Sequence, residues 1–508
     1  MTEERLPMST DSLIGRTDAR EVDPLDLVSP KRYGQSGPPH ALWHMMRHHD
    51  PVHWCEPEGF ESFWAITRHE DITEISSQPD VFSNALGIVV LNDQQVAAQE
   101  RDDNPLRTMR TIIEMDPPDH RIYRKIASGF FTPRGIGELD QIVTASARRL
   151  IDSLGDEGEC DFIDRIAQRH PLRVLATILG IDRDDEERLL ELTQQLFASD
   201  DPDYQRAGDD RTEASKQVGL EFYAMFDRII KDRRTHPRDD LATLLANTTL
   251  PGGETMGALE TFGYYLIVFT AGHDTTRNAL SGALAAFVEH PDELRKVGAK
   301  LALTKPAVEE IIRWTTPVNY MKRTALRDAE VRGQTIREGE RLVLFYASAN
   351  RDDEVFDHPF TFDVTRHPNR HVGFGWAEHF CLGAHLARAS THALVHELAG
   401  RVESLEFSGP VLQTESSFVE GNQANYATTA SSRKRPISVA DKPSTSARIS
   451  SVCWPIVGAG IAAMRPNPAG SSGCPAARTL PMPGCSICAN NGFAVEQRGS
   501  SSTSCMND

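Results

Sequence analysis

The chain has 508 residues, of which 39% are hydrophobic and 7% aromatic, and its formal net charge at pH 7 is −19. This length and hydrophobic content exclude a small disulfide scaffold and a disordered protein. The acidic balance argues against a nucleic-acid binder or an anionic-membrane binder, because the long-range field would repel both partners. The first residues lack the basic and apolar regions of a signal peptide, and no apolar run is long enough for a membrane span. We therefore expect a cytoplasmic protein.

The eight cysteines are unevenly distributed along the chain. Residues 1–440 contain three of them, Cys55, Cys160 and Cys381, which fits a reducing compartment better than a disulfide framework. The last 68 residues contain five, including the pair Cys485-x-x-Cys488. One such pair without a second pair or a histidine is weak support for a zinc site. Because this tail is rich in Gly, Pro and Ser, we predict that it is disordered.

The N-terminal third shows few regular patterns. Residues 1–35 are polar and interrupted by prolines, and we expect an arm that lies on the surface. Apolar residues alternate with polar ones between positions 50 and 68, which predicts a pair of strands. Residues 84–110 have mixed polarity, which is typical of a binding loop or lid.

From position 119, apolar residues recur with the spacing of an α-helix. Helices are expected at 119–130, 139–154, 162–178, 184–198, 213–233 and 238–246. The next helix, about 254–289, is the longest, and because its middle is apolar on nearly every face it should run through the protein centre. Strand patterns follow at 323–325, 329–331, 334–336 and 341–346, and one more helix at 384–403. The sequence therefore predicts a mainly α fold with small β-sheets, an α+β arrangement.

The most informative segment is residues 372–388, VGFGWAEHFCLGAHLAR. Cys381 lies in a glycine-containing loop just before a helix, so we expect helix amides and the positive helix end to stabilise its thiolate, which metals bind. Gly375 and Gly383 let the backbone approach a flat ligand closely, and Phe374 can shield the sulfur from water. The alternative is a buried, inert cysteine at a turn.

A second segment, Ala271-Gly-His-Asp-Thr-Thr276, lies inside the long apolar helix. Gly272 lowers helix stability by roughly 1 kcal/mol when it lies in a helix interior. Asp274 and Thr275 place a carboxylate and a hydroxyl in an apolar stretch, where buried polar groups need hydrogen-bond partners or a functional role. One interpretation is a local opening of the helix that holds water and a small ligand. The other is a kink whose threonine hydroxyls bond back to preceding carbonyls, and the sequence leaves both open.

Together with Glu310 and Arg313, three apart on one helical face, these segments resemble the cytochrome P-450 superfamily of haem-thiolate monooxygenases over about residues 36–430. The loop pattern F-G-x-G-x-H/R-x-C-x-G is matched at Phe374, Gly375, His379, Cys381 and Gly383. The central-helix pattern A/G-G-x-D/E-T is complete at Ala271, Gly272, Asp274 and Thr275, and E-x-x-R is complete at Glu310 and Arg313.

One position departs from the family pattern. Ala377 stands where the second glycine of the loop is usual. If that position takes a positive φ, the alanine adds strain there, which would alter haem affinity or loop rigidity.

The resemblance implies a cofactor and roles for particular residues. The cofactor is haem b, with Cys381 as its metal ligand, an axial thiolate, and Ala271 and Gly272 leave a groove for dioxygen. Thr275 would donate a hydrogen bond to the dioxygen, and Asp274 would link it to a proton supply. The residues implied to bind haem propionates are His120, Arg124, Arg323 and His379, and Arg366 is implied to join the E-x-x-R pair in a structural triad.

The chain shows neither a flavin nor an iron–sulfur motif, so a separate ferredoxin and ferredoxin reductase are implied as electron donors. A ferredoxin is acidic, and the cations expected to dock it are Arg121, Lys125, Arg134 and Arg388. No nucleic acid and no membrane span is expected.

The substrate implied by family position is an apolar small molecule. The segments expected to line its pocket are 85–110, 268–271, 317–321 and 417–420, with Asn319 and Tyr320 as polar handles. Stretches such as 345–352 and 371–375 resemble bacterial enzymes that act on terpenoids, including linalool and terpineol hydroxylases, and on sterol side chains. A terpenoid hydroxylase is favoured, with a sterol side-chain hydroxylase or an aromatic or alkyl hydroxylase as the alternative.

Two other classes compete with this interpretation. A cysteine hydrolase would use Cys381 as nucleophile and His379 or His385 as base, but residues two and four apart rarely point together at a loop-to-helix turn. A haem sensor without enzymatic activity would need Cys381 and would have no use for Asp274 and Thr275. The predicted organisation is an arm at 1–35, a haem-thiolate domain at 36–430 and a tail at 431–508.

Overall fold

The computed structural model describes residues 22–99, 111–155, 159–197, 211–409, 411–424 and 426–431. The predicted tail therefore lies outside the described residues, apart from its first position. So do the first 21 residues of the predicted arm and residues 100–110 of the expected lid. The domain boundaries stay predictions.

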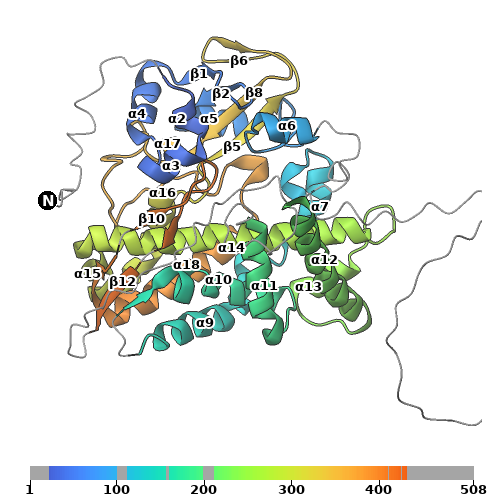
Figure 1. The fold of residues 1–508 in the computed structure, drawn as a ribbon, viewed down its shortest axis with the longest axis vertical. Coiled ribbons are helices and arrows are strands. Elements are labelled where there is room, and N and C mark those ends of the chain that lie inside the picture. The colour runs from blue at the N-terminus through green and yellow to red at the C-terminus, as the bar shows by residue number, and fades with distance from the viewer. Residues whose placement is uncertain are drawn as a thin grey trace, which may run out of the picture. The chain divides into compact units, whose positions relative to one another are not determined.

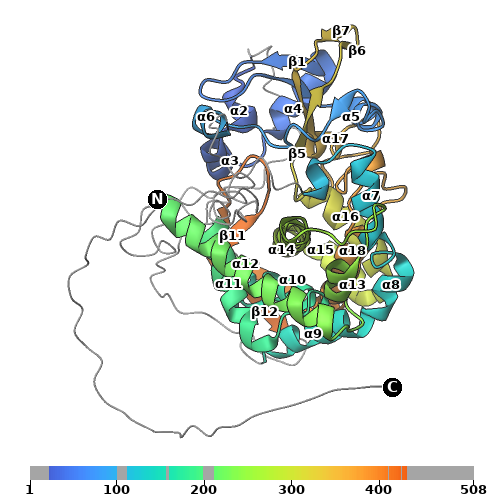
Figure 2. The ribbon, with the colours of Figure 1, turned by 90° about the vertical axis from the view of Figure 1, so that its right-hand side faces the viewer.

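A single long helix organises the helical part of the fold. α14 (Ala258–Glu289) spans 32 residues and packs against α10 (Arg169–Ile178), α16 (Thr304–Thr315) and α18 (Ala384–Arg401). Figure 1 shows it between the strand-containing part and the helices α9, α10 and α18, and Figure 2 shows it end-on and enclosed by other helices. Its buried residues cover all faces, as a helix that is apolar all round requires. The predicted central helix is confirmed.

The predicted helices before α14 all form. They are α7 (Asp119–Ser128), α9 (Asp140–Asp152), α10, α11 (Arg183–Phe197), α12 (Arg211–Thr235) and α13 (Leu241–Asn247). The expected helix 162–178 is divided, because a π-helical turn (Ile163–Ala167) precedes α10. The remaining α-helices are α4 (His40–His49), α5 (His69–Ser76), α6 (Asp93–Gln99), α8 (Pro133–Glu138), α15 (Pro291–Ala299) and α17 (Tyr346–Ala349), besides two at the N-terminus.

The largest sheet has five strands in the order β1-β2-β8-β5-β3. Its strands are β1 (Val52–Cys55), β2 (Phe63–Ile66), β3 (Phe82–Ser83), β5 (Tyr320–Ala325) and β8 (Arg341–Phe345). β1 and β2 are antiparallel, with Val52 opposite Ile66, which confirms the predicted strand pair. β2 and β8 are parallel, and β5 joins β8 antiparallel.

Three small sheets complete the β-structure of the described residues. β6 (Ala329–Val331) pairs with β7 (Gln334–Ile336), and β10 (Leu412–Gln413) pairs with β11 (Asn422–Ala424). β12 (Tyr426–Ser431) lies between β4 (Glu159–Asp161) and β9 (Val402–Phe407). The predicted mainly α fold with small sheets is confirmed. Within the described ranges, no helix combines the length and apolar content needed to cross a bilayer.

The prediction of a surface arm is wrong for its described part. Residues 25–36 form α2 (Leu25–Val28) and α3 (Pro30–Ser36), and Leu27, Val28 and Tyr33 are buried in a cluster with Trp43. Two short helices separated by Ser29 and followed by Gly37 give no sustained helical period, which explains why the sequence pattern concealed them.

A buried ion cluster anchors α16. Glu310 and Arg313 are both fully buried, with Arg313 Nη2 at 2.7 Å from Glu310 Oε1. Arg366 Nε lies 3.1 Å from Glu310 Oε2, so the expected triad forms. Arg313 also donates to the carbonyls of Asn350 and Pro359. Since removal of one partner would leave an unpaired buried charge, this cluster fixes the segment that leads to the cysteine loop.

Candidate active site

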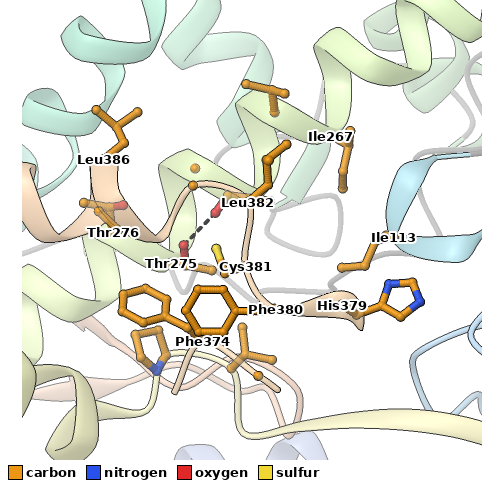
Figure 3. Close-up of a pocket in the computed structure, with 18 of the residues that line it drawn as sticks. Ile113, Ile267, Thr275, Thr276, Phe374, His379, Phe380, Cys381, Leu382 and Leu386 are labelled. Carbon is orange, nitrogen blue, oxygen red and sulfur yellow. Dashed lines mark hydrogen bonds between the residues drawn. The ribbon is translucent and has the colours of Figure 1, made fainter. Parts of the chain in front are cut away.

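A cavity of about 220 Å³ lies between α14, α10 and the cysteine loop. Side chains from several elements project into it, as Figure 3 shows for Ile267 of α14, Ile113 and Leu386 of α18. Its aliphatic wall comes mainly from Ile113, Val174, Leu175, Ile267, Val268, Val318 and Met321. A largely apolar cavity with a few polar groups is the usual form of a small-molecule site.

Cys381 faces this cavity from the loop before α18. The loop is closed by a hydrogen bond from the Cys381 amide to the Phe374 carbonyl, 2.8 Å. Burial raises the pKa of the Cys381 thiol, although the Gly383 amide and the charges of Arg124 and Arg388 oppose this. The predicted stabilisation of the thiolate by the helix end is therefore present but is outweighed by desolvation. Ligation of a metal ion is what would keep this sulfur deprotonated.

Three basic groups gather around His379, and all four residues line the cavity. The rings of His120 and His379 are 4.2 Å apart, and Arg124 and Arg323 act electrostatically on His379. Burial, with these neighbouring charges, lowers the pKa of His379 to about 2. Its Nε2 atom is buried and has no partner among the described residues. The structure thus brings together the four residues expected to bind propionates, a donor set suited to an enclosed carboxylate.

Glu378 holds His120 of this group, and no sequence pattern pointed to it. Its Oε1 lies 3.1 Å from His120 Nδ1, and both carboxylate oxygens accept from Arg121 at 3.0 Å. Burial lowers the pKa of His120 despite this contact, and Arg121 and His120 lower that of Glu378. Because the two partners are more than 250 residues away in sequence, no local pattern could have indicated the contact.

Thr275 lines the cavity on α14, with Ala271 and Gly272 one turn before it. Its hydroxyl donates to the Ala271 carbonyl at 2.6 Å, and α14 is continuous here (Figure 3). Of the two interpretations left open, the structure shows the threonine bonded back to the preceding turn. The carboxylate of Asp274 lies 3.5 Å from His273 Nδ1 and 3.7 Å from Arg277 Nε. Although burial opposes ionisation, Arg277 and His273 hold the pKa of Asp274 below its usual value.

The pocket prediction holds for part of the wall. Val268 and Ala271 line the cavity, as do Pro317, Val318 and Met321. The two polar handles are wrong, because neither Asn319 nor Tyr320 lines the cavity. Asn319 Nδ2 donates to the Ser417 carbonyl at 3.1 Å, and the hydroxyl of Tyr320 accepts from the Val90 amide at 3.3 Å.

Other parts of the predicted wall differ as well. The described residues that line the cavity include none of 85–99 or 417–420. Asn84 lines it instead: its Nδ2 donates to the Ile113 carbonyl, and its Oδ1 is buried without a partner in the described part of the chain. The sequence around Asn84 is a short polar segment without a regular pattern, so it could not predict that this residue lines the cavity.

One of the four cations expected to dock the ferredoxin is engaged within the protein. Arg388 pairs with Glu309 at 2.7 and 2.8 Å and lies 4.4 Å from the Phe374 ring centre, so its charge is neutralised beside the cysteine loop. Lys125 and Arg134 are exposed, and Arg121 is exposed while paired with Glu378.

The family model described as Cytochrome P450 matches residues 88–400. The chain belongs to the cytochrome P450 family. Among curated relatives, it is 38% identical to Cytochrome P450-terp of Pseudomonas sp over 80% of this chain and 97% of that protein. Linalool 8-monooxygenase of Pseudomonas putida is 33% identical over 78% of this chain and 96% of that protein. The crystal structure of CYP108D1 from Novosphingobium aromaticivorans superposes with a TM-score of 0.73 at 33% identity, covering 80% of this chain and 98% of that one.

Cytochromes P450 are haem-thiolate proteins, and the residues of this cavity fit that cofactor. The cavity offers one thiol, an unpaired imidazole nitrogen on His379 and two guanidinium groups, within an otherwise mainly apolar wall. These are the ligand and the counter-charges that a flat, apolar group with an iron and two carboxylates needs.

The cysteine loop carries strain at Ala377, whose φ is +55°, as the missing glycine led us to expect. We predict that Ala377→Gly stabilises the haem-loaded protein by about 1 kcal/mol. The left-handed conformation costs an L-residue roughly 1–2 kcal/mol, and the freer unfolded chain of glycine offsets part of the gain. Urea unfolding measures the change.

The matched control is Ala389→Gly, in the middle of α18. This substitution should lower the free energy of unfolding by about 1 kcal/mol, because alanine favours the helical conformation more than glycine does. Equal destabilisation by both substitutions would show that Ala377 is not strained.

Proposed function

We propose that this cytochrome P450 monooxygenase hydroxylates a terpenoid, with Cys381 as the axial thiolate of haem b. The observation that carries the proposal is that Cys381 and Thr275 face one mainly aliphatic cavity, with His379 and its basic neighbours also in the wall. A cysteine hydrolase does not account for this set. Of its two candidate bases, His385 does not line the cavity, and burial keeps His379 a very weak base.

When bound, haem supplies the oxidising chemistry that inserts one oxygen atom of dioxygen into a C–H bond. Cys381 would hold the haem iron through its thiolate sulfur and supply electron density to it, and the Gly383 amide would stabilise the negative charge on that sulfur. Phe374, held by Arg388 over its ring, keeps water away from the sulfur. Arg124 and Arg323 would bind the propionates and neutralise their charge, and the neutral imidazoles of His120 and His379 would donate hydrogen bonds to them.

Thr275 and Asp274 control protons on the opposite wall. The Thr275 hydroxyl donates to Ala271 in the structure, and rotation about χ1 would turn the same proton toward the cavity. Asp274 is the neighbouring residue on α14, and Arg277 and His273 keep it ionised at rest, so it would first take up a proton from solvent and then pass that proton to the Thr275 oxygen. The hydroxyl is therefore the last proton donor before dioxygen, and the carboxylate resupplies it.

Electrons come, in this proposal, from a ferredoxin and a ferredoxin reductase. Arg121, Lys125 and Arg134 are the exposed cations near the cysteine side that would meet an acidic ferredoxin.

The substrate class rests on the shape and chemistry of the wall. Branched aliphatic side chains such as Ile267, Val268 and Val318 suit a compact branched hydrocarbon skeleton better than a flat aromatic one. The buried Oδ1 of Asn84 would favour a substrate with one hydroxyl group. The monooxygenase of Pseudomonas putida named for linalool, a relative at 33% identity, supports the same class.

Replacement of Thr275 by alanine tests the oxygenase mechanism. With redox partners and substrate supplied, we expect haem to remain bound while product formed per NAD(P)H consumed falls by about tenfold or more, with electrons released as hydrogen peroxide. Thr270→Ala is the matched control, because Thr270 makes the same bond to the preceding turn, at 2.9 Å to Leu266, but does not line the cavity.

Unchanged product yield in Thr275→Ala would contradict its role as proton donor. No product from the wild-type protein under the same conditions would favour a haem sensor.

The substrate is tested by following the Soret band of the haem-loaded protein while ligands displace water from the pocket. We expect a monoterpene alcohol to bind at least about tenfold more tightly than a sterol, and more tightly than the matching hydrocarbon. A sterol that binds most tightly would assign the enzyme to the sterol side-chain alternative.

A further inference from the structure

Three potential metal ligands meet on the surface, and none of them lines the cavity. His44 and His48 are four residues apart on α4, so their side chains share one face of the helix. Asp353 follows α17 in the chain. One ligand atom from each of the three lies within 4.8 Å of the others, and His48 Nε2 is 3.1 Å from Asp353 Oδ2.

The two segments that carry these ligands are locked together beneath them. Arg47 of α4 is buried, and its guanidinium donates to the carbonyl and the hydroxyl of Ser348 in α17 at 3.2 and 2.9 Å. On the other segment, the Asp352 carboxylate accepts a hydrogen bond from the backbone amide of His69 at 2.9 Å. The ligand positions are therefore set by buried hydrogen bonds, which reduces the ordering that a bound ion must impose.

We propose that His44, His48 and Asp353 form a binding site for one divalent transition-metal ion such as Zn²⁺ or Ni²⁺. Two imidazoles and one carboxylate suit these ions, whereas Mg²⁺ and Ca²⁺ need more oxygen ligands. Two ligand atoms about 3 Å apart can share one ion at bond lengths of about 2.0–2.2 Å. His48 and Asp353 already have that spacing, and in the proposed site these two exposed side chains would rotate toward the half-buried His44, whose ligand atom lies within 4.8 Å of theirs.

The charges around the site are compatible with a cation. The nearest positive group is Arg47, whose Nη2 lies 3.5 Å from His44 Nδ1, a contact at the outer limit of a hydrogen bond. Asp352 and Asp353 compensate that charge. Each imidazole can offer one ring nitrogen to the ion.

A bound ion would join α4 to the segment after α17. Because the unfolded chain does not hold the three ligands together, binding would stabilise the folded state in proportion to the logarithm of the metal concentration above Kd.

The experiment titrates the full-length, haem-loaded protein with NiCl₂ by calorimetry. We expect His48→Ala to lose one nickel equivalent and Asp353→Asn to bind that equivalent more than roughly tenfold more weakly. Both side chains are more than one third exposed, so the fold should survive, and the spectrum of the reduced carbon monoxide complex checks this. Any nickel that binds elsewhere, for example to the cysteines of residues 441–508, binds equally to all variants, so it cancels when the variants are compared.

His396→Ala is the matched control. His392 and His396 form another i,i+4 pair, on α18, with ring centres 5.7 Å apart, but no third ligand group is grouped with them among the described residues. Its nickel stoichiometry and affinity should equal those of the wild type. The proposal is overturned if His48→Ala keeps all its nickel equivalents, if Asp353→Asn binds unchanged, or if His396→Ala loses as much as His48→Ala.

Discussion

The position of the Cys381 sulfur, which is exposed toward the cavity and surrounded there by protein, is the constraint on which the active site depends. In the cavity, burial raises the pKa of this thiol, so the protein alone favours the neutral form. A metal ion bound to the sulfur would favour the thiolate over the thiol. The Gly383 amide, with Arg124 and Arg388 nearby, lowers the cost of that charge without removing it.

The rest of the fold holds both walls of this cavity in place. On one side, the buried Glu310–Arg313–Arg366 cluster fixes the segment before the cysteine loop, and Glu309 holds Arg388 over Phe374. On the other side, α14 is enclosed by helices and carries Thr275 into the cavity. A rigid frame of this kind explains how the loop tolerates the left-handed conformation of Ala377.

Features set by local pattern could be predicted, and features set by distant partners could not. The all-round apolar period predicted α14, and alternation predicted β1 and β2. Glu378 could not be assigned, because its partner His120 lies far away in sequence. For the same reason Arg388 looked like a free cation, and Asn319 looked like a substrate contact until its bond to Ser417 was seen. The short helices before residue 37 were hidden because neither is long enough to establish a period.

The central claim, that Cys381 is the haem ligand, is tested most directly by the absorption spectrum of the reduced protein with carbon monoxide. A thiolate ligand predicts a band near ~450 nm. That band should disappear in Cys381→Ser and persist in Cys55→Ser, since Cys55 is buried in a separate cluster. A band near ~450 nm that survives in Cys381→Ser would contradict the account.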